Sequence, residues 1–270
     1  MRRHPPYRVQ NVLPGQETGL PPLTRRLLGW EIVVVFAVSL GASALLAIIS
    51  LIGSLTARKA LGHQQALLIG SLAPGRPWLD LSLQLANILV TLAPVALVFY
   101  LMARSGESPS DMGLDTTRPG SDLARGAALA AIIGGLGLGL YITAFHLGVS
   151  LNVVPESLPA VWWRIPVLIL KGFQNGILEE ILVIGYLLRR LDQLGWTPAH
   201  AIILSAVLRG SYHLYQGLGG FLGNAAMGVV FGILFYRWRR VTPFIVAHAL
   251  IDTVAFVGYA ALHGHVSWLP

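Results

Sequence analysis

Seven long apolar stretches occupy most of this sequence and constrain its fold more than any other feature. A membrane-spanning helix needs about 20 mostly apolar residues, and hydrocarbon admits only helices or closed barrels. Only 11% of the residues are Asp, Glu, Lys or Arg, whereas soluble domains carry about a quarter. The sequence therefore predicts an all-α protein, a polytopic transmembrane helical bundle of about seven spans. The predicted spans cover residues 30–56, 83–103, 123–149, 165–188, 198–216, 220–236 and 243–262.

The segment before the first apolar stretch, residues 1–29, is proline-rich and basic, and we predict a flexible cytoplasmic tail there. Residues 30–270 are predicted to form one transmembrane domain. A signal peptide is a poor fit, because the first stretch is 27 residues long and the apolar core of a signal peptide has about 7–15. Residues 57–82 are predicted to form a loop with a short interfacial helix around residues 61–72.

The net charge of +7 would point to nucleic acid in a soluble protein, but most basic residues here flank apolar stretches. In that position they set topology and contact anionic lipid headgroups, so we expect the lipid bilayer as a partner and no nucleic acid. The Lys and Arg counts of the short loops predict a cytoplasmic N-terminus, although Arg58, Lys59 and Arg76 lie in a loop on the opposite side. We expect the protein to lie in a bacterial cell membrane. The absence of cysteine excludes a disulfide scaffold, a thiolate zinc site and a cysteine nucleophile.

Ionisable residues at membrane depth are energetically costly and therefore mark candidate functional sites. Glu179 and Glu180 are adjacent in the fourth predicted span. Adjacent helix positions diverge by about 100°, so we expect one carboxylate to face a cavity and the other to be held by a partner. A carboxylate facing a cavity suits a general base or a proton carrier. The alternative is a structural pair bonded to a cation.

Two later spans carry histidines. His213 lies near the end of the fifth span, one helical turn after Arg209, while His248 and Asp252 share one face of the seventh span. With the two glutamates, these residues form a water-activating constellation suited to amide hydrolysis, which needs a base and electrophilic stabilisers. The alternative is that His213, His248 and Asp252 hold a divalent metal such as zinc, whose bound water is the nucleophile.

Three other ionisable residues lie in or beside the third and fourth spans, and we interpret them as structural: His146, Arg164 and Lys171. Lys171 precedes Glu179 by about two helical turns. Its long side chain is expected to extend outward toward the membrane surface.

The order of the motifs resembles the CPBP family of intramembrane proteases, which contains the type II CAAX prenyl proteases and bacteriocin-processing or self-immunity enzymes. The family pattern is Glu-Glu-x-x-x-Arg, then Phe-x-x-x-His, then His-x-x-x-Asn or Asp, on successive transmembrane helices. In this chain the matching motifs occur in the same order within a core of residues 165–260: Glu179-Glu180, His213 and His248-x-x-x-Asp252. The resemblance implies a CAAX-protease-like fold.

The resemblance also implies roles for these residues. Glu179 and His213 are expected to activate water, with Glu180 as the supporting carboxylate. His248 and Asp252 are expected to stabilise the tetrahedral intermediate.

Two positions depart from the family pattern. Ile184 stands where the first motif has arginine, and Arg209 stands where the second motif has phenylalanine. A buried carboxylate needs a charged or hydrogen-bonding partner. We therefore hypothesise that Arg209 supplies, from the neighbouring helix, the charge that Ile184 lacks for Glu180.

The predicted function is hydrolysis of a peptide bond in a membrane-associated protein or peptide, by water that a glutamate and a histidine activate. One alternative is a catalytically inactive membrane adaptor or immunity protein of the same fold. Another is an ion- or proton-coupled transporter that uses the same buried carboxylates, although the sequence shows no repeat between its halves to support it.

Overall fold

The computed structural model of this protein describes residues 24–265 and is mostly helical. The α-helices are α1 (Arg25–Ala37), α2 (Leu40–Thr56), α3 (Pro77–Thr91), α4 (Ala93–Arg104), α5 (Pro119–His146), α6 (Arg164–Glu179), α7 (Leu187–Gln193), α8 (Pro198–Ser211), α9 (Leu218–Trp238) and α10 (Thr242–Leu262). The other elements are the 3₁₀ helices η1 (Leu61–His63), η2 (Pro109–Met112) and η4 (Leu214–Gln216), the π-helix η3 (Glu180–Tyr186), and the strands β1 (Gln65–Ile69) and β2 (Asn152–Glu156).

Helix α1 begins inside the segment that was expected to be a tail. The side chain of Thr24 accepts a hydrogen bond from the backbone N–H of Leu27 at 3.2 Å, and such a cap satisfies one of the free donors at a helix start. The helix therefore starts at Arg25 rather than at Trp30. Residues 1–23 of the expected tail lie outside the described residues.

Among the described residues, four helical segments are long and apolar enough to cross a membrane: Pro77–Arg104, α5, α9 and α10. A fifth candidate exists if α1 and α2, which are bent by 51° relative to each other, form one broken span. Helices α6 and α8 have 16 and 14 residues, fewer than the roughly 17–25 of a spanning helix. The structure thus shows four to five candidate spans, and the remaining two or three of the seven stay a prediction.

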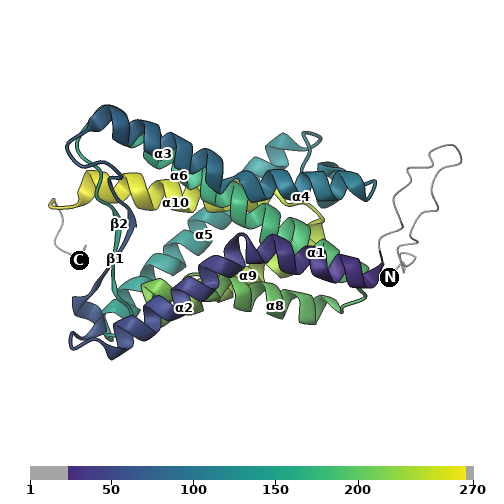
Figure 1. The fold of residues 1–270 in the computed structure, drawn as a ribbon, viewed down its shortest axis with the longest axis horizontal. Helices are drawn as coiled ribbons and strands as arrows, with labels where there is room; N and C mark the ends of the chain where they lie inside the picture. The colour runs from purple at the N-terminus through teal and green to yellow at the C-terminus, as the bar shows by residue number, and fades with distance from the viewer. Residues whose placement is uncertain (1–23, 266–270) are drawn as a thin grey trace, which may run out of the picture.

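The helices form two groups that meet around the middle of the protein (Figure 1). Helix α10 packs against α6 and α5, and α3 lies beside α6. Helix α8 packs against α9, and α2 contacts both α8 and η4. Apolar side chains such as Leu182, Phe231 and Phe244 are fully buried where the two groups meet.

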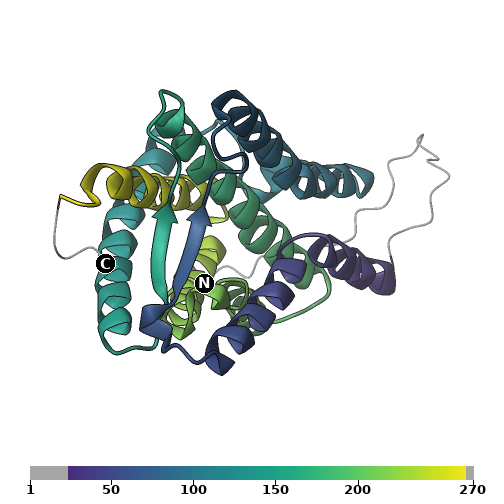
Figure 2. The same ribbon diagram turned by 60° about the vertical axis from the view of Figure 1, so that its left-hand side comes forward.

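A two-stranded parallel sheet adds to the mostly helical fold, and of the interfacial helix expected around residues 61–72 only the 3₁₀ helix η1 is present. Strand β1 pairs with β2, from Gln65 opposite Asn152 to Ile69 opposite Glu156. The β-branched Val153 and Val154 favour extended structure, but their partner strand is far away in the sequence, so local patterns do not reveal the pairing. Figure 2 shows the sheet lying across one end of the helices.

Helices α6 and α10 approach each other closely because two glycines face the contact. A Cβ atom on Gly172 would lie 2.6 Å from Thr253 Oγ1, and one on Gly176 would lie 2.9 Å from Ala249 N and from Ile245 O. Such four-residue spacing of small residues lets backbones of membrane helices touch.

We expect Gly176→Ala to destabilise the protein by about 1–3 kcal/mol, because the added methyl group overpacks a contact made of backbone atoms. Gly135→Ala on α5 is the matched control, since nothing lies within 4 Å of the added Cβ. That substitution should be neutral or stabilising, because alanine favours a helix interior over glycine. Thermal unfolding in detergent, followed by circular dichroism, measures both; equal melting temperatures would contradict the close contact.

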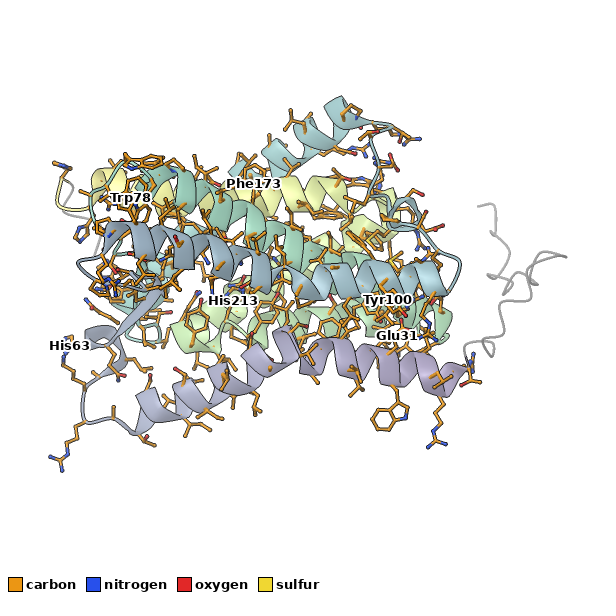
Figure 3. The ribbon with its side chains drawn as sticks, turned by 45° about the horizontal axis from the view of Figure 1, so that its top comes forward. Glu31, His63, Trp78, Tyr100, Phe173 and His213 are labelled. Atoms are coloured by element: carbon orange, nitrogen blue, oxygen red, sulfur yellow. The ribbon has the colours of Figure 1, made fainter. Side chains whose placement is uncertain are left out.

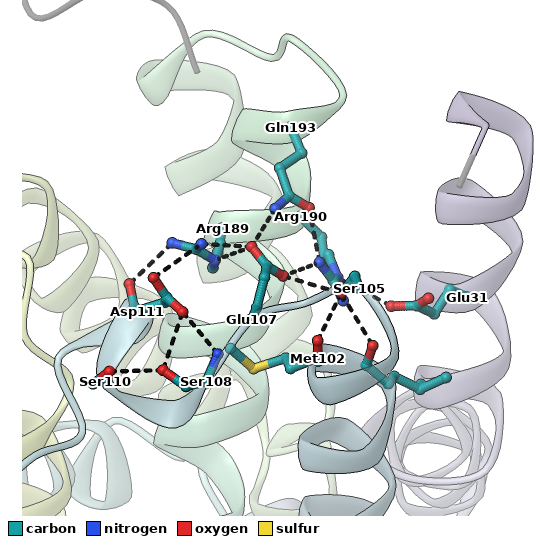
Figure 4. A network of polar contacts seen from close by, with 11 residues as sticks. Glu31, Met102, Ser105, Glu107, Ser108, Ser110, Asp111, Arg189, Arg190 and Gln193 are labelled. Carbon is teal, nitrogen blue, oxygen red and sulfur yellow. Dashed lines mark hydrogen bonds and ion pairs between the residues drawn. The ribbon is translucent and has the colours of Figure 1, made fainter. Parts of the chain in front are cut away.

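Buried ion pairs join helix ends on the side where α1 begins (Figure 4). Arg190 donates to Glu107 Oε2 at 2.5 Å and to Glu31 Oε1 at 3.0 Å, and Arg189 Nε donates to Glu107 Oε1 at 2.7 Å. The Arg190 side chain is 1% exposed. These arginines therefore connect α1 and α7 with the segment that follows α4.

A second cluster fixes the turn between α9 and α10. Arg240 Nη2 donates to Asp122 Oδ2 at 2.6 Å and to Asp115 Oδ1 at 2.9 Å. The hydrogen bonds from Arg240 hold the pKa of the Asp115 carboxyl well below its usual value. This turn sets the start of α10, the helix that carries His248 and Asp252.

Candidate active site

The two glutamates lie at a change of helix type. Glu179 is the last residue of α6, and Glu180 is the first residue of the π-helix η3. The backbone N–H of Leu187 bonds to the carbonyl oxygen of Leu182, the five-residue step of a π-helix. Such segments are rare and occur frequently at functional sites. Glu180 is fully buried, while the Glu179 side chain is 10% exposed.

Arg209 from α8 is the cation beside both carboxylates. Its Nη2 atom lies 2.6 Å from Glu180 Oε1 and 3.5 Å from Glu179 Oε2, and its side chain is fully buried. The contact between Arg209 and Glu180 is the one hypothesised from the sequence. Ile184 meanwhile lies in the apolar core. Gly228 on α9 leaves room for the arginine, because a Cβ there would lie 3.3 Å from Arg209 Cδ.

His248 lies between two acidic groups. Its Nδ1 atom is 2.7 Å from Glu180 Oε1 and 3.0 Å from Arg209 Nη2, and its Nε2 atom is 3.6 Å from Asp252 Oδ2. The side-chain amide of Asn175, on α6, donates to the same Asp252 oxygen at 2.7 Å. The third motif therefore contacts the first motif directly, across the close α6–α10 interface.

Glu179 faces the end of α8. The hydroxyl group of Tyr212 donates to Glu179 Oε2 at 2.7 Å, and His213 Nε2 lies 3.7 Å from the same oxygen. The other ring nitrogen of His213 lies 3.3 Å from the amide nitrogen of Gln216. In the view of Figure 3, His213 lies between His63, at the left, and Glu31, on the right-hand side.

All five predicted site residues thus lie in one continuous set of contacts, with Arg209 in its centre. They divide by exposure: the side chains of Asp252, His213 and Glu179 are 19%, 14% and 10% exposed, while those of Glu180 and Arg209 are 0% exposed. Asp252, His213 and Glu179 are therefore the more exposed members of the site, and Glu180 and Arg209 form its fully buried ion pair.

Two residues of the site were missed by the sequence analysis. Tyr212 is adjacent to His213, and its aromatic ring gave no sign that its hydroxyl group would contact Glu179. Asn175 is a polar residue in an apolar span, four positions before Glu179 and so on nearly the same helix face. That polarity was the available signal.

The residues suggested as metal ligands do not fit a zinc site. Among residues 24–265, no group of three or more His, Cys, Asp and Glu side chains is arranged to hold a metal ion. The guanidinium group of Arg209 lies within 3.0 Å of His248 Nδ1 and of Glu180, so a cation already neutralises this side of the cluster. His213, His248 and Asp252 therefore do not form a ligand set here.

Residues 161–254 match the family model of type II CAAX prenyl endopeptidases, Rce1-like. This segment is Rce1-like. It runs from the residues before α6 into α10 and contains every site residue described above. The match confirms the resemblance drawn from the three motifs. No curated protein and no solved structure matches the chain significantly.

Proposed function

We propose that this protein is an integral membrane endopeptidase that hydrolyses a peptide bond of a membrane-associated protein or peptide, with Glu179 as general base. The Rce1-like match supports the class of reaction. The arrangement around Glu179 supports its role: it is the more exposed glutamate, and Tyr212 and His213 both face its Oε2 atom.

In the proposed reaction, the Glu179 carboxylate takes a proton from a water molecule, and the water oxygen bonds to the scissile carbonyl carbon. The carbonyl electron pair moves to oxygen and gives a tetrahedral oxyanion. When that oxyanion re-forms the C=O bond, the C–N bond breaks and the proton taken up by Glu179 passes to the leaving amine. The products are a carboxylic acid and an amine, and transfer of the acid proton to the amine gives a carboxylate and an ammonium group.

The two histidines have different roles in the proposed reaction: His213 donates a hydrogen bond, and His248 contributes positive charge. If Gln216 donates to His213 Nδ1, the N–H group of His213 is on Nε2 and points toward Glu179, where it can orient the water. The 3.7 Å separation of His213 Nε2 and Glu179 Oε2 is within reach through one shared water. The ring of His248 is held between Glu180 and Asp252, and as an imidazolium it adds positive charge that favours the oxyanion electrostatically.

The observation that carries the proposal is that Glu180 and Glu179 have different surroundings. Glu180 is fully buried and contacts Arg209 and His248. Glu179 instead contacts Tyr212 and lies near the partly exposed His213. Two neighbouring carboxylates thus have two separate tasks, one structural and one chemical.

The test uses the full-length protein reconstituted in liposomes with two fluorescence-quenched peptides, one farnesylated at a C-terminal CAAX sequence and one unprenylated transmembrane peptide. Cleavage of either by the wild type, and its loss in His213→Ala, is expected. An inactive adaptor predicts no cleavage by the wild type of any peptide, and that outcome would refute the proposal. Cleavage of only the farnesylated peptide would assign the substrate class.

We also propose that the N-terminus is cytoplasmic, and the absence of cysteine in the chain makes this directly testable. Single cysteines are placed at two exposed positions, Ala60 in the segment after α2 and Thr116 in the segment before α5, and these two segments lie at opposite ends of the helices (Figure 1). A membrane-impermeant maleimide should label Ala60→Cys in intact spheroplasts and Thr116→Cys only after lysis. The reverse pattern would show the opposite orientation.

A further inference from the structure

Lys171 is a buried cation outside the site described so far. It lies on α6, about two turns before Glu179, and it is 9% exposed. Its ammonium group donates to Asn87 Oδ1 of α3 at 2.5 Å and to Gln174 Oε1 at 3.2 Å. The expected outward extension of this side chain is therefore wrong, because amide oxygens hold it inside the protein.

Both groups that accept hydrogen bonds from Lys171 are neutral. Among the described residues, no carboxylate forms an ion pair with it: the ion pairs there involve only arginines and histidines. A buried charge without a counter-ion is costly. Methionine would fill similar space without that cost, so the contact with the two amides does not by itself account for a lysine at this position.

The side-chain amides of Gln174 and Asn175 connect Lys171 to the candidate site through hydrogen bonds. Gln174 Nε2 donates to Asn175 Oδ1 at 3.0 Å, and Asn175 Nδ2 donates to Asp252 Oδ2 at 2.7 Å. The contacts then pass from Asp252 to His248 at 3.6 Å. A continuous series of polar contacts therefore leads from α3 through α6 to α10.

The chemistry of lysine sets the direction of this series. An ammonium group only donates hydrogen bonds, so Gln174 must present its oxygen to Lys171 and its NH₂ group to Asn175. Asn175 must then accept through its oxygen and present its own NH₂ group to Asp252. A flipped Asn175 amide would place an oxygen against the Asp252 carboxylate.

We propose that Lys171 is a positioning residue for the proposed hydrolytic site, acting on Asp252 and His248 through the ordered amides of Gln174 and Asn175. In such a series each bond polarises the next one. The cation and the carboxylate at its two ends both favour the same amide orientation, so the Asp252 carboxylate is held in one position beside the His248 ring. This inference rests on the proposed function only in its kinetic part.

The kinetic test compares Lys171→Met with Lys59→Met, the other lysine of the chain, which is exposed. In metal sites, loss of a residue that orients a ligand typically costs about 10–100-fold, and we expect a positioning residue of this site to lie at the lower end of that range. For Lys171→Met we expect a fall of about tenfold in kcat with KM within about twofold, and recovery of most of the loss in Lys171→Arg. Lys59→Met should match the wild type. A loss of kcat in Lys171→Met that Lys171→Arg does not recover would show a role in packing only.

A double-mutant cycle gives an independent check. Hydrogen bonds connect Lys171 to Asn175 through Gln174, so Lys171→Met and Asn175→Ala should be non-additive, and the double variant should be no slower than the slower single variant. Additive losses would overturn the proposal.

A substrate-free measurement separates this inference from the proposed function. In the full-length protein labelled with ¹⁵N-histidine, Lys171→Met should shift the Nε2 resonance of His248, and Lys59→Met should not. If the wild type cleaves no peptide but the resonance shifts, the hydrolytic function fails and the positioning effect stands. An unchanged His248 resonance in Lys171→Met overturns the positioning effect, whatever the activity.

Discussion

Arg209→Met is expected to lower the free energy of unfolding by about 3–5 kcal/mol, because it removes one partner of a buried ion pair and leaves the other uncompensated. Glu180 would keep a fully buried carboxylate with His248 as its nearest cationic group. The variant should also lose cleavage activity, since Glu179 lies 3.5 Å from the same arginine. Unfolding of the purified protein in mixed detergent micelles measures the first effect.

Two matched variants show whether the lost charge is the cause. Arg237→Met removes an exposed arginine on α9, and surface substitutions usually change stability by less than about 0.5 kcal/mol. The double variant Arg209→Phe with Ile184→Arg restores the family pattern and should recover part of the stability lost in Arg209→Phe alone. Wild-type stability of Arg209→Met would contradict the role assigned to this arginine.

Glu179→Gln is expected to reduce cleavage by about 10²–10⁴-fold, the usual contribution of a general base. The folded protein should persist, because glutamine has the same shape and its amide oxygen can still accept the hydrogen bond from Tyr212. Activity is measured with the quenched peptides in liposomes, and stability by unfolding in the same detergent. A large loss of both would indicate a structural role for Glu179.

Glu179→Asp is the control for the chemistry of this position. It keeps a carboxylate but withdraws it by one methylene group, so part of the activity should remain. Equal activity of Glu179→Gln and the wild type would exclude this residue as the base, and Glu180 is too deeply buried to replace it.

The sequence was sufficient to locate the helices and the motif residues. The apolar stretches are long, and each of them falls on helical segments of the structure. The contact between Arg209 and Glu180 was predictable for a different reason: a charge missing at Ile184 had to be balanced by another cation, and an arginine lay one turn before His213.

Features that depend on contacts between distant parts of the chain, or on small changes of helix geometry, could not be predicted from the sequence. Strand β1 was predicted to be part of a loop, because its partner β2 lies far away in the sequence, between α5 and α6. The amino-acid composition of Glu180–Tyr186 does not distinguish this π-helix from an ordinary apolar α-helix. The number of spans also remains a prediction, since α6 and η3 follow each other without a break while α6 alone is short. The place of Lys171 depends on Asn87 from α3, a contact that no periodicity reveals.

The most direct test of the central claim is mass spectrometry of the peptide products formed in H₂¹⁸O. If Glu179 activates water for peptide-bond hydrolysis, the wild type will produce a new carboxyl terminus that contains one ¹⁸O atom, and Glu179→Gln will produce almost none. An intact peptide after incubation with the wild type, or equal product from both proteins, would contradict the account.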